Sequence, residues 1–136
     1  MPGSQEKGIA CLLDTDIVID FLRRRNYAQT LIKKWAGEGL LAISALTNLE
    51  IYQGIKSGEE EATRAFLDGL TTIDVDVQIA RQAGQMLAGL RSKGVTVGLT
   101  DSIIAATALQ LSVPLLTNNV VHYPFTDLKV VIGSQP

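Results

Sequence analysis

Four carboxylates stand where stretches of hydrophobic sequence end or where helices are expected to begin. Asp14 and Asp16 follow a short apolar run, and Glu50 and Asp101 lie near the starts of two later helices. If these side chains converge, the repulsion between their charges must be relieved by protonation or by a cation. Ligands that offer only oxygen suit Mg²⁺ or Mn²⁺, and a divalent ion held by carboxylates supports phosphodiester hydrolysis. The acids therefore indicate metal-dependent hydrolysis, provided that the fold brings them together.

Each acid also has a purely structural explanation. Asp14 could be a cap or turn residue, because Asp is common after a strand where a helix begins. Glu50 could complete a capping box with Thr47, and Asp101 could favour the positive end of its helix dipole. Neither Asp14 nor Asp101 has an adjacent Lys or Arg to neutralise it, and this favours chemistry for the set as a whole.

The hydrophobic pattern alternates between strand-like runs and helical periodicity. The run at residues 9–13 is typical of a strand covered on both faces, and helical spacing follows with Thr15 or Asp16 as the N-cap. Asp14 thus leaves the carboxyl end of a buried strand, where open α/β sheets place their ligand crevices. The expected strands are residues 9–13, 40–43, 72–75, 115–117 and 129–132, and the expected helices are 16–22, 27–36, 47–56, 59–70, 77–93 and 102–111. Because helices separate the strands, we predict a three-layer α/β/α fold around a central, mostly parallel sheet of four to five strands.

Composition and charge exclude several classes of protein. Of the 136 residues, 46% are hydrophobic and 19% are charged, which fits one folded domain, residues 1–136, and not a disordered or fibrous chain. The net charge of −2 argues against a surface built mainly to bind nucleic acid. The single cysteine, Cys11, lies in an apolar run and indicates a buried side chain in a reducing compartment. With no membrane-spanning run and no signal peptide in the sequence, we expect a cytoplasmic protein without a membrane partner.

Four segments, in order along nearly the whole chain, carry a family resemblance. They are LLDTDIVI at residues 12–19, SALTNLEI at 44–51 with Gly54, DSIIAATA at 101–108, and LLTNN at 115–119 with His122 and Tyr123. The sequence at these segments resembles the PIN-domain family, and within it the VapC toxins of toxin–antitoxin pairs. The resemblance implies an endoribonuclease that depends on Mg²⁺ or Mn²⁺ bound in an acidic crevice. It also implies a homodimer, an RNA substrate and a cognate VapB-like antitoxin that lays a peptide near the site.

The resemblance assigns roles to individual positions. Asp14, Glu50 and Asp101 match the acidic, metal-binding residues of the family. Thr117 matches the hydroxyl residue after the fourth strand, and Asp16 matches an auxiliary position. The sequence departs from the family pattern at Asn119, because many PIN nucleases have another Asp at this position. An amide accepts a hydrogen bond there without adding charge, which leaves open whether one or two metal ions bind.

Other polar residues allow two interpretations each. His122 is a candidate general base, although a structural hydrogen bond is the commoner use of a loop histidine. Asp20 lies one turn after Asp16 and is either a solvated group or a support for the site. The basic run formed by Arg23, Arg24 and Arg25 follows the helix that begins at the site, so these residues either contact RNA phosphates or form a solvated turn.

Two other functions remain compatible with the sequence. Asp14-Thr15-Asp16 after a strand is similar to the nucleophile motif of haloacid-dehalogenase phosphatases, with Asp14 as nucleophile. That reaction needs a downstream Lys and a later acidic pair on a loop, and Asp101 at the head of an apolar helix fits this poorly. A weakly active module that mainly binds RNA or an antitoxin is the second alternative. Turnover in the presence of Mn²⁺ would separate it from an active nuclease.

Overall fold

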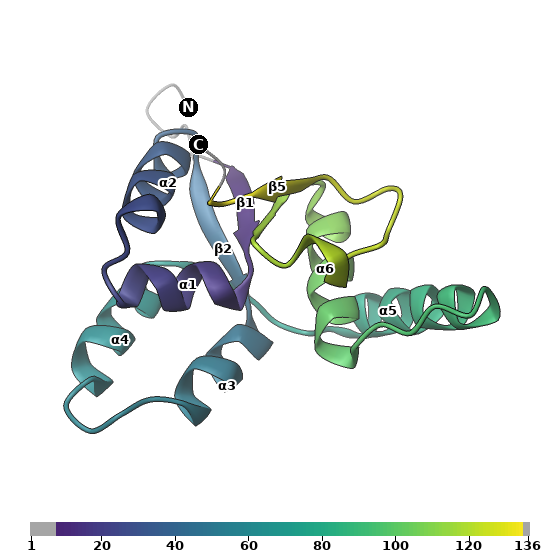
Figure 1. The fold of residues 1–136 in the computed structure, drawn as a ribbon, viewed down its shortest axis with the longest axis horizontal. Helices are drawn as coiled ribbons and strands as arrows, with labels where there is room; N and C mark the ends of the chain where they lie inside the picture. The colour runs from purple at the N-terminus through teal and green to yellow at the C-terminus, as the bar shows by residue number, and fades with distance from the viewer. Residues whose placement is uncertain (1–7, 135–136) are drawn as a thin grey trace, which may run out of the picture.

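A parallel sheet of five strands forms the centre of the computed structural model, which describes residues 8–134 (Figure 1). The strands are β1 (Ile9–Leu13), β2 (Leu40–Ser44), β3 (Thr71–Ile73), β4 (Leu115–Thr117) and β5 (Val130–Ile132). Their order in the sheet is β3-β2-β1-β4-β5, and every neighbouring pair is parallel. The predicted three-layer fold is confirmed.

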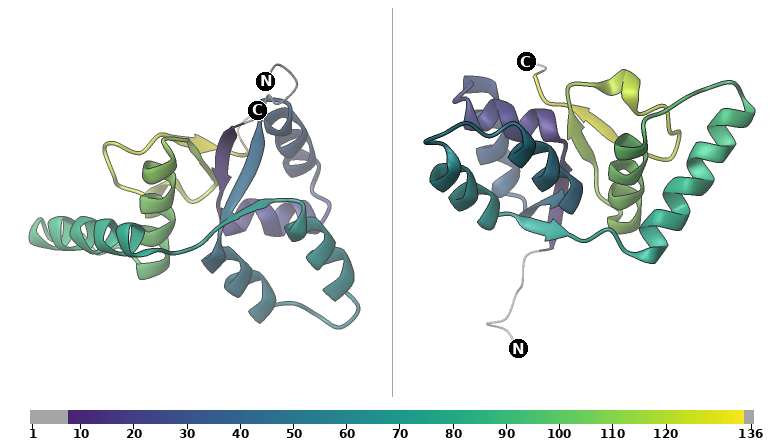
Figure 2. Two further views of the ribbon diagram at one scale, coloured as in Figure 1. Left: turned by 180° about the vertical axis from the view of Figure 1, so that it is seen from behind. Right: turned by 90° about the horizontal axis from the view of Figure 1, so that it is seen from below.

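Helices cover both faces of this sheet, as Figures 1 and 2 show. They are α1 (Thr15–Leu22), α2 (Asn26–Ala36), α3 (Ala45–Gln53), α4 (Glu60–Asp68), α5 (Val77–Ser92) and α6 (Leu99–Leu111), with a 3₁₀ turn η1 (Val120–His122). The helices α1 and α2 lie on one side of the sheet, whereas α5 and α6 lie on the other. α6 packs between the sheet and α5, which explains why its sequence is apolar almost all round.

Alternate side chains of β1 enter two separate hydrophobic clusters. Cys11 and Leu13 pack with α1 and α2, whereas Leu12 packs with residues of α6. All three side chains are fully buried. The continuous apolar run of β1 therefore reflects a strand with both faces covered, as the sequence indicates.

The direction in which the chain winds reverses at β1. The chain passes from β1 through α1 and α2 to β2 on one side, and later through α5 and α6 to β4 on the other. In open parallel sheets the crevice at such a switch point lies outside the carboxyl ends of the strands. Asp14 follows the end of β1, and Thr117 is the last residue of β4. These two residues therefore lie side by side at the switch point, 2.7 Å apart at their side-chain oxygens.

Three predicted helix starts are wrong. α6 begins at Leu99 and not at residue 102, and in the other two helices a side chain at the end of a buried strand, or directly after it, caps the helix. Asp14, not Thr15 or Asp16, is the N-cap of α1, and its carboxylate accepts a hydrogen bond from the Thr15 amide at 2.8 Å. Ser44 caps α3 by accepting a hydrogen bond from the Leu46 amide at 3.1 Å. Thr47 consequently lies inside α3 and is fully buried, so Thr47 and Glu50 form no capping box.

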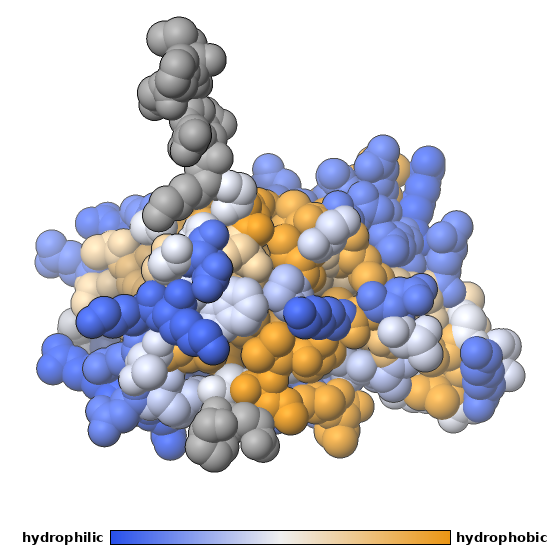
Figure 3. All heavy atoms as spheres, turned by 90° about the horizontal axis from the view of Figure 1, so that it is seen from above, coloured by the Kyte–Doolittle hydropathy of each residue, from blue (hydrophilic) through white to orange (hydrophobic). Residues whose placement is uncertain are grey.

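The surface combines apolar and polar regions. Figure 3 shows hydrophobic side chains gathered in the middle of the face seen from above, with hydrophilic side chains around them. Elsewhere, large apolar side chains such as Leu49 in α3 and Leu99 at the start of α6 are 61% and 73% exposed. None of the helices within residues 8–134 is long and apolar enough to cross a membrane.

Candidate active site

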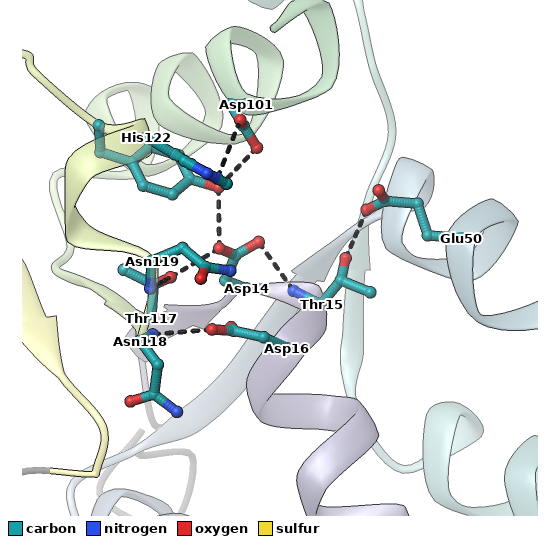
Figure 4. A network of polar contacts seen from close by, with 10 residues as sticks. Asp14, Thr15, Asp16, Glu50, Asp101, Thr117, Asn118, Asn119 and His122 are labelled. Carbon is teal, nitrogen blue, oxygen red and sulfur yellow. Dashed lines mark hydrogen bonds and ion pairs between the residues drawn. The ribbon is translucent and has the colours of Figure 1, made fainter. Parts of the chain in front are cut away.

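Asp14 is the centre of a hydrogen-bond network at the ends of β1 and β4 (Figure 4). Its side chain is only 5% exposed, and one oxygen, Oδ1, accepts the bond from the Thr15 amide. The other oxygen, Oδ2, accepts hydrogen bonds from the Thr117 hydroxyl at 2.7 Å and the Tyr123 hydroxyl at 2.9 Å. All three donors are neutral groups, so they fix the carboxylate in place without supplying a positive charge to it.

Asp101 reaches the same network from the first turn of α6. Its Oδ1 lies 3.3 Å from the Tyr123 hydroxyl, and its Oδ2 lies 3.5 Å from Nδ1 of His122. Burial and the nearby charge of Asp14 raise the pKa of Asp101 above its usual range, and contacts with His122 and Tyr123 act in the opposite direction. Asp14 and Asp101, which are far apart in sequence, therefore meet at a single hydroxyl group.

Glu50 is joined to this network through Thr15. The Thr15 hydroxyl donates a hydrogen bond to Oε1 of Glu50 at 2.6 Å, and it lies 3.0 Å from the Thr47 hydroxyl. Since the single proton of Thr15 points to Glu50, Thr47 is the donor in the second contact. Thr15 thus contacts Asp14 through its backbone and Glu50 through its side chain, which places Glu50 on the other side of Thr15 from Asp14 (Figure 4).

Asp16 connects α1 to the loop after β4. Its two carboxylate oxygens each accept a backbone hydrogen bond at 2.8 Å, one from Ile17 and one from Asn118. Burial and the charge of Asp14 raise the pKa of Asp16 to about 6. The side chain therefore fixes the loop that carries Thr117 and Asn119.

The remaining predicted residues lie at the rim of the crevice. The Asn119 backbone amide donates to the Thr117 hydroxyl at 3.0 Å, and the residue itself is exposed. The His122 side chain is 53% exposed and contacts Asp101. The structure thus brings His122 to an acid of the network, whereas the contact of Asn119 is made by its backbone.

Sequence reasoning missed two residues that hold the acids. Tyr123 belongs to one of the four segments that carry the family resemblance. No periodic pattern in the sequence indicates that its hydroxyl contacts both Asp14 and Asp101. Burial and these two carboxylates raise its pKa, so Tyr123 is a neutral hydrogen-bond donor. Thr15 was interpreted only as a possible helix cap. A hydroxyl directly after Asp14 is the one local signal that could have indicated its role.

The three arginines have different surroundings. Arg23 lines a cavity of about 310 Å³ between α1, α3 and α4, and Glu50 lines the same cavity. Arg25 forms an ion pair with Asp20, with Nε 3.2 Å from Oδ1, and Asp20 also accepts a hydrogen bond from Tyr27. Arg24 has a left-handed backbone conformation, with φ of 60°. Arg23 thus shares a cavity with Glu50, whereas Arg25 is paired with Asp20, which lies outside the network around Asp14.

The donor chemistry of the site fits a divalent cation. Among residues 8–134 no Lys or Arg forms an ion pair with Asp14, Glu50 or Asp101. Their side chains offer only oxygen, which Mg²⁺ and Mn²⁺ prefer. Within the same residues, no three acidic, His or Cys side chains already surround a common point. Closer approach of Glu50 or Asp101 to Asp14 would therefore accompany binding of an ion that uses all three.

Comparison with known proteins identifies relatives of this chain. Residues 11–123 match the PIN domain. Ribonuclease VapC19 of Mycobacterium tuberculosis is 35% identical over 120 residues, which cover 87% of this chain and 96% of the relative. VapBC2 from Rickettsia felis bound to a promoter DNA fragment has a TM-score of 0.80 at 23% identity, over 90% of this chain and 97% of the other. A toxin–antitoxin complex from Klebsiella pneumoniae has a TM-score of 0.79 at 27% identity, over 93% of this chain and the whole of the other.

The fold and the site define a parallel α/β domain with an acidic crevice at its switch point. The chain belongs to the PIN-domain family, in the group of VapC-type proteins. The match to the PIN domain does not favour a haloacid-dehalogenase phosphatase, which the sequence alone also allows. In addition, no Lys pairs with Asp14 among the residues that the structure describes.

Proposed function

We propose that this protein is an endoribonuclease that requires Mg²⁺ or Mn²⁺, with Asp14, Glu50 and Asp101 as the residues that hold the metal. The observation that carries the proposal is the meeting of Asp14 and Asp101 at one hydroxyl with no basic side chain paired to Asp14. Two carboxylates placed so close together, with no Lys or Arg paired to either among the described residues, favour a cation. The name of the relative VapC19, a ribonuclease, supports RNA as the substrate.

The side chains of the network have separate tasks in this proposal. A bound divalent cation lowers the pKa of a water molecule and offsets the charge that develops on the phosphate. Thr117 and the Thr15 amide orient Asp14, and the Thr15 hydroxyl orients Glu50. Asp16 keeps the loop after β4 in position through the Asn118 amide. We assign to the exposed Asn119 the role of accepting a hydrogen bond from a water at the site.

Binding of the RNA backbone is assigned chiefly to Arg23. Arg23 lines the cavity that Glu50 also lines, so a phosphate bound by this arginine would share that cavity with Glu50. Arg25 is paired with Asp20, which leaves less of its charge for a phosphate. Arg24 remains a candidate for a contact at the rim.

The partners follow from the relatives. The solved relatives include toxin–antitoxin complexes, and we propose that this protein is likewise the toxin of such a pair and is bound by a VapB-like antitoxin. A homodimer is part of the same proposal. The exposed Leu49 and Leu99 are apolar side chains of the kind that protein interfaces cover.

The proposal is tested by cleavage of a labelled RNA with purified protein, in EDTA and after addition of Mn²⁺. We expect cleavage only with the cation. Asp14→Asn, Glu50→Gln and Asp101→Asn should each lower the rate by roughly two decades or more, because each removes a charged ligand from the site. Cleavage in EDTA at the full rate, or full activity in all three variants, would refute the assignment.

A matched control uses the same chemical change outside the network. Asp68 is an exposed carboxylate at the end of α4, and Asp68→Asn should cleave at the wild-type rate. The same assay addresses the binding-module alternative. A wild-type protein that binds RNA and shows no turnover with Mn²⁺ would favour that alternative over the nuclease.

A further inference from the structure

The Tyr123 side chain contacts two acids of the network, Asp14 and Asp101. Its hydroxyl donates to Oδ2 of Asp14 at 2.9 Å and lies 3.3 Å from Oδ1 of Asp101. Asp14 directly follows β1 and Asp101 belongs to α6, so a single side chain links the end of the sheet strand to the helix that covers the sheet.

Packing, not the hydroxyl, holds the ring of Tyr123. The side chain is 4% exposed and belongs to the hydrophobic cluster that includes Leu12 of β1, Ile104 of α6 and Leu115 of β4. A phenylalanine fits the same space, because it differs only by the missing oxygen. The position of the ring and the function of the hydroxyl are therefore separable by mutation.

The hydrogen bonds of Asp14 occupy most of the acceptor sites of its carboxylate. A carboxylate has about four acceptor sites, and Asp14 uses three of them for Thr15, Thr117 and Tyr123. The remaining site allows a contact with a cation through one lone pair. The Tyr123 hydroxyl also lies against Asp101, so one side chain contacts both carboxylates.

We propose that Tyr123 is a positioning residue that holds the carboxylates of Asp14 and Asp101 ready for the divalent cation. The inference rests on the proposed function, because it concerns the same metal. Neutral hydrogen-bond donors that orient metal ligands affect affinity by restricting the motion of those ligands. The Asp101 side chain is 28% exposed, so without the hydroxyl it is free to turn towards solvent.

A purely structural role for Tyr123 leads to a different expectation. If the hydroxyl only satisfied the hydrogen bonding of buried polar groups, its removal would lower the stability of the metal-free protein and leave the affinity for the cation unchanged. If it positions the carboxylates, the affinity itself falls. The dissociation constant of the metal is therefore the readout that separates the two roles.

The experiment measures Mn²⁺ binding by electron paramagnetic resonance in wild-type protein, Tyr123→Phe and Tyr52→Phe, after metal removal and without RNA. We expect Tyr123→Phe to bind Mn²⁺ about tenfold more weakly than the wild type. Tyr52 is 43% exposed, and Tyr52→Phe, which makes the same chemical change at the surface, should bind as the wild type does. Melting in EDTA establishes that each variant is folded.

A second variant restores a donor at the same place. Replacement of Tyr123 by 4-aminophenylalanine supplies an N–H group on the same ring, and its Mn²⁺ affinity should return towards that of the wild type. This comparison remains decisive if Tyr123→Phe does not fold, since a folded amino variant that binds tenfold more weakly than wild type would contradict the inference.

The outcomes distinguish the inference from the proposed function. Wild-type protein that binds no Mn²⁺ would overturn the metal assignment, and the positioning role with it. Wild-type binding with equal or tighter binding by Tyr123→Phe would overturn the positioning role alone. Weaker binding by Tyr123→Phe, with recovery in the amino variant, supports both.

Discussion

Threonine hydroxyls hold two of the three acids at the candidate site. Thr117 donates to Asp14, and Thr15 donates to Glu50. Both threonines are buried, so each hydroxyl is held by its surroundings and directs its single proton to a carboxylate. This arrangement orients the acids while leaving their charges for a cation.

Thr15→Val tests whether Glu50 must be held. Valine has nearly the same shape. It removes the donor to Glu50 and the acceptor of the Thr47 hydroxyl, while the Thr15 backbone amide still donates to Asp14. We expect RNA cleavage with Mn²⁺ to fall about tenfold, because an orienting partner of a metal ligand is lost. The measurement is the cleavage rate at saturating RNA.

Thr107→Val is the matched control for this change. Thr107 is buried in α6, and its hydroxyl donates to the carbonyl of Ile103 in the same helix at 2.7 Å. Its replacement should leave the cleavage rate unchanged. Wild-type rates in Thr15→Val would show that Glu50 needs no fixed orientation.

Cys11 provides a prediction for alkaline pH. Burial raises the pKa of its thiol from 9.0 to about 12, so the unfolded chain loses this proton at lower pH than the folded protein does. The contribution of Cys11 to the free energy of unfolding is therefore fully present below pH 9 and is lost between pH 9 and 12. Urea unfolding across this range should show a steeper loss of stability in the wild type than in Cys11→Ala. Equal pH dependence in the two proteins would contradict the burial of a neutral thiol.

At the scale of elements, the approach of β2 to the start of β1 depends on a small residue. A Cβ atom at Gly39 would lie 2.5 Å from the carbonyl oxygen of Gly8 and 3.2 Å from Cβ of Ala10. The Leu40 amide donates to that same Gly8 oxygen at 2.9 Å, so the contact is part of the pairing between β1 and β2. The turn before β2 therefore has no room for a larger residue.

Gly39→Ala should lower the free energy of unfolding by about 1–3 kcal/mol, because the added methyl group forces the backbone apart. Chemical denaturation measures the change. Gly84→Ala is the control, since Gly84 is in the interior of α5 and a Cβ there meets nothing within 4 Å. Alanine at that helical position should raise stability by up to about 1 kcal/mol. If Gly84→Ala lowered the free energy of unfolding as much as Gly39→Ala does, crowding at β1 would not be the cause of the destabilisation.

The sequence predicts the strands well and the contacts between acids only in part. The apolar run of β1 and the apolar helix α6 follow from burial on all sides, which local composition reveals. Local composition does not reveal the hydrogen-bond partner of Glu50. A glutamate at this position suits a capping box with Thr47, and it equally suits a hydrogen bond from Thr15, which belongs to another helix. The link through Tyr123 is likewise absent from local pattern, since a loop residue meets Asp14 only after the sheet has formed.

At the scale of the whole molecule, topology explains why acids from distant segments meet. Strands β1 and β4 are neighbours at the point where winding reverses, and α6 returns the chain to β4. Asp14, Thr117 and Asp101 therefore reach one crevice from three elements. A chain with a net charge of only −2 thus places several negative side chains in a small region, and this local concentration favours a cation.

The most direct test of the central claim is a Mn²⁺ titration of metal-free wild-type protein, followed in parallel by melting temperature and by RNA cleavage. A ligand that binds only the folded state stabilises it by about 2.7 kcal/mol at a concentration of 100 times its dissociation constant. We expect the melting temperature and the cleavage rate to rise over the same range of Mn²⁺, and Asp14→Asn to lose both responses. Cleavage that proceeds fully in EDTA, with a melting temperature that Mn²⁺ does not change, would contradict the claim.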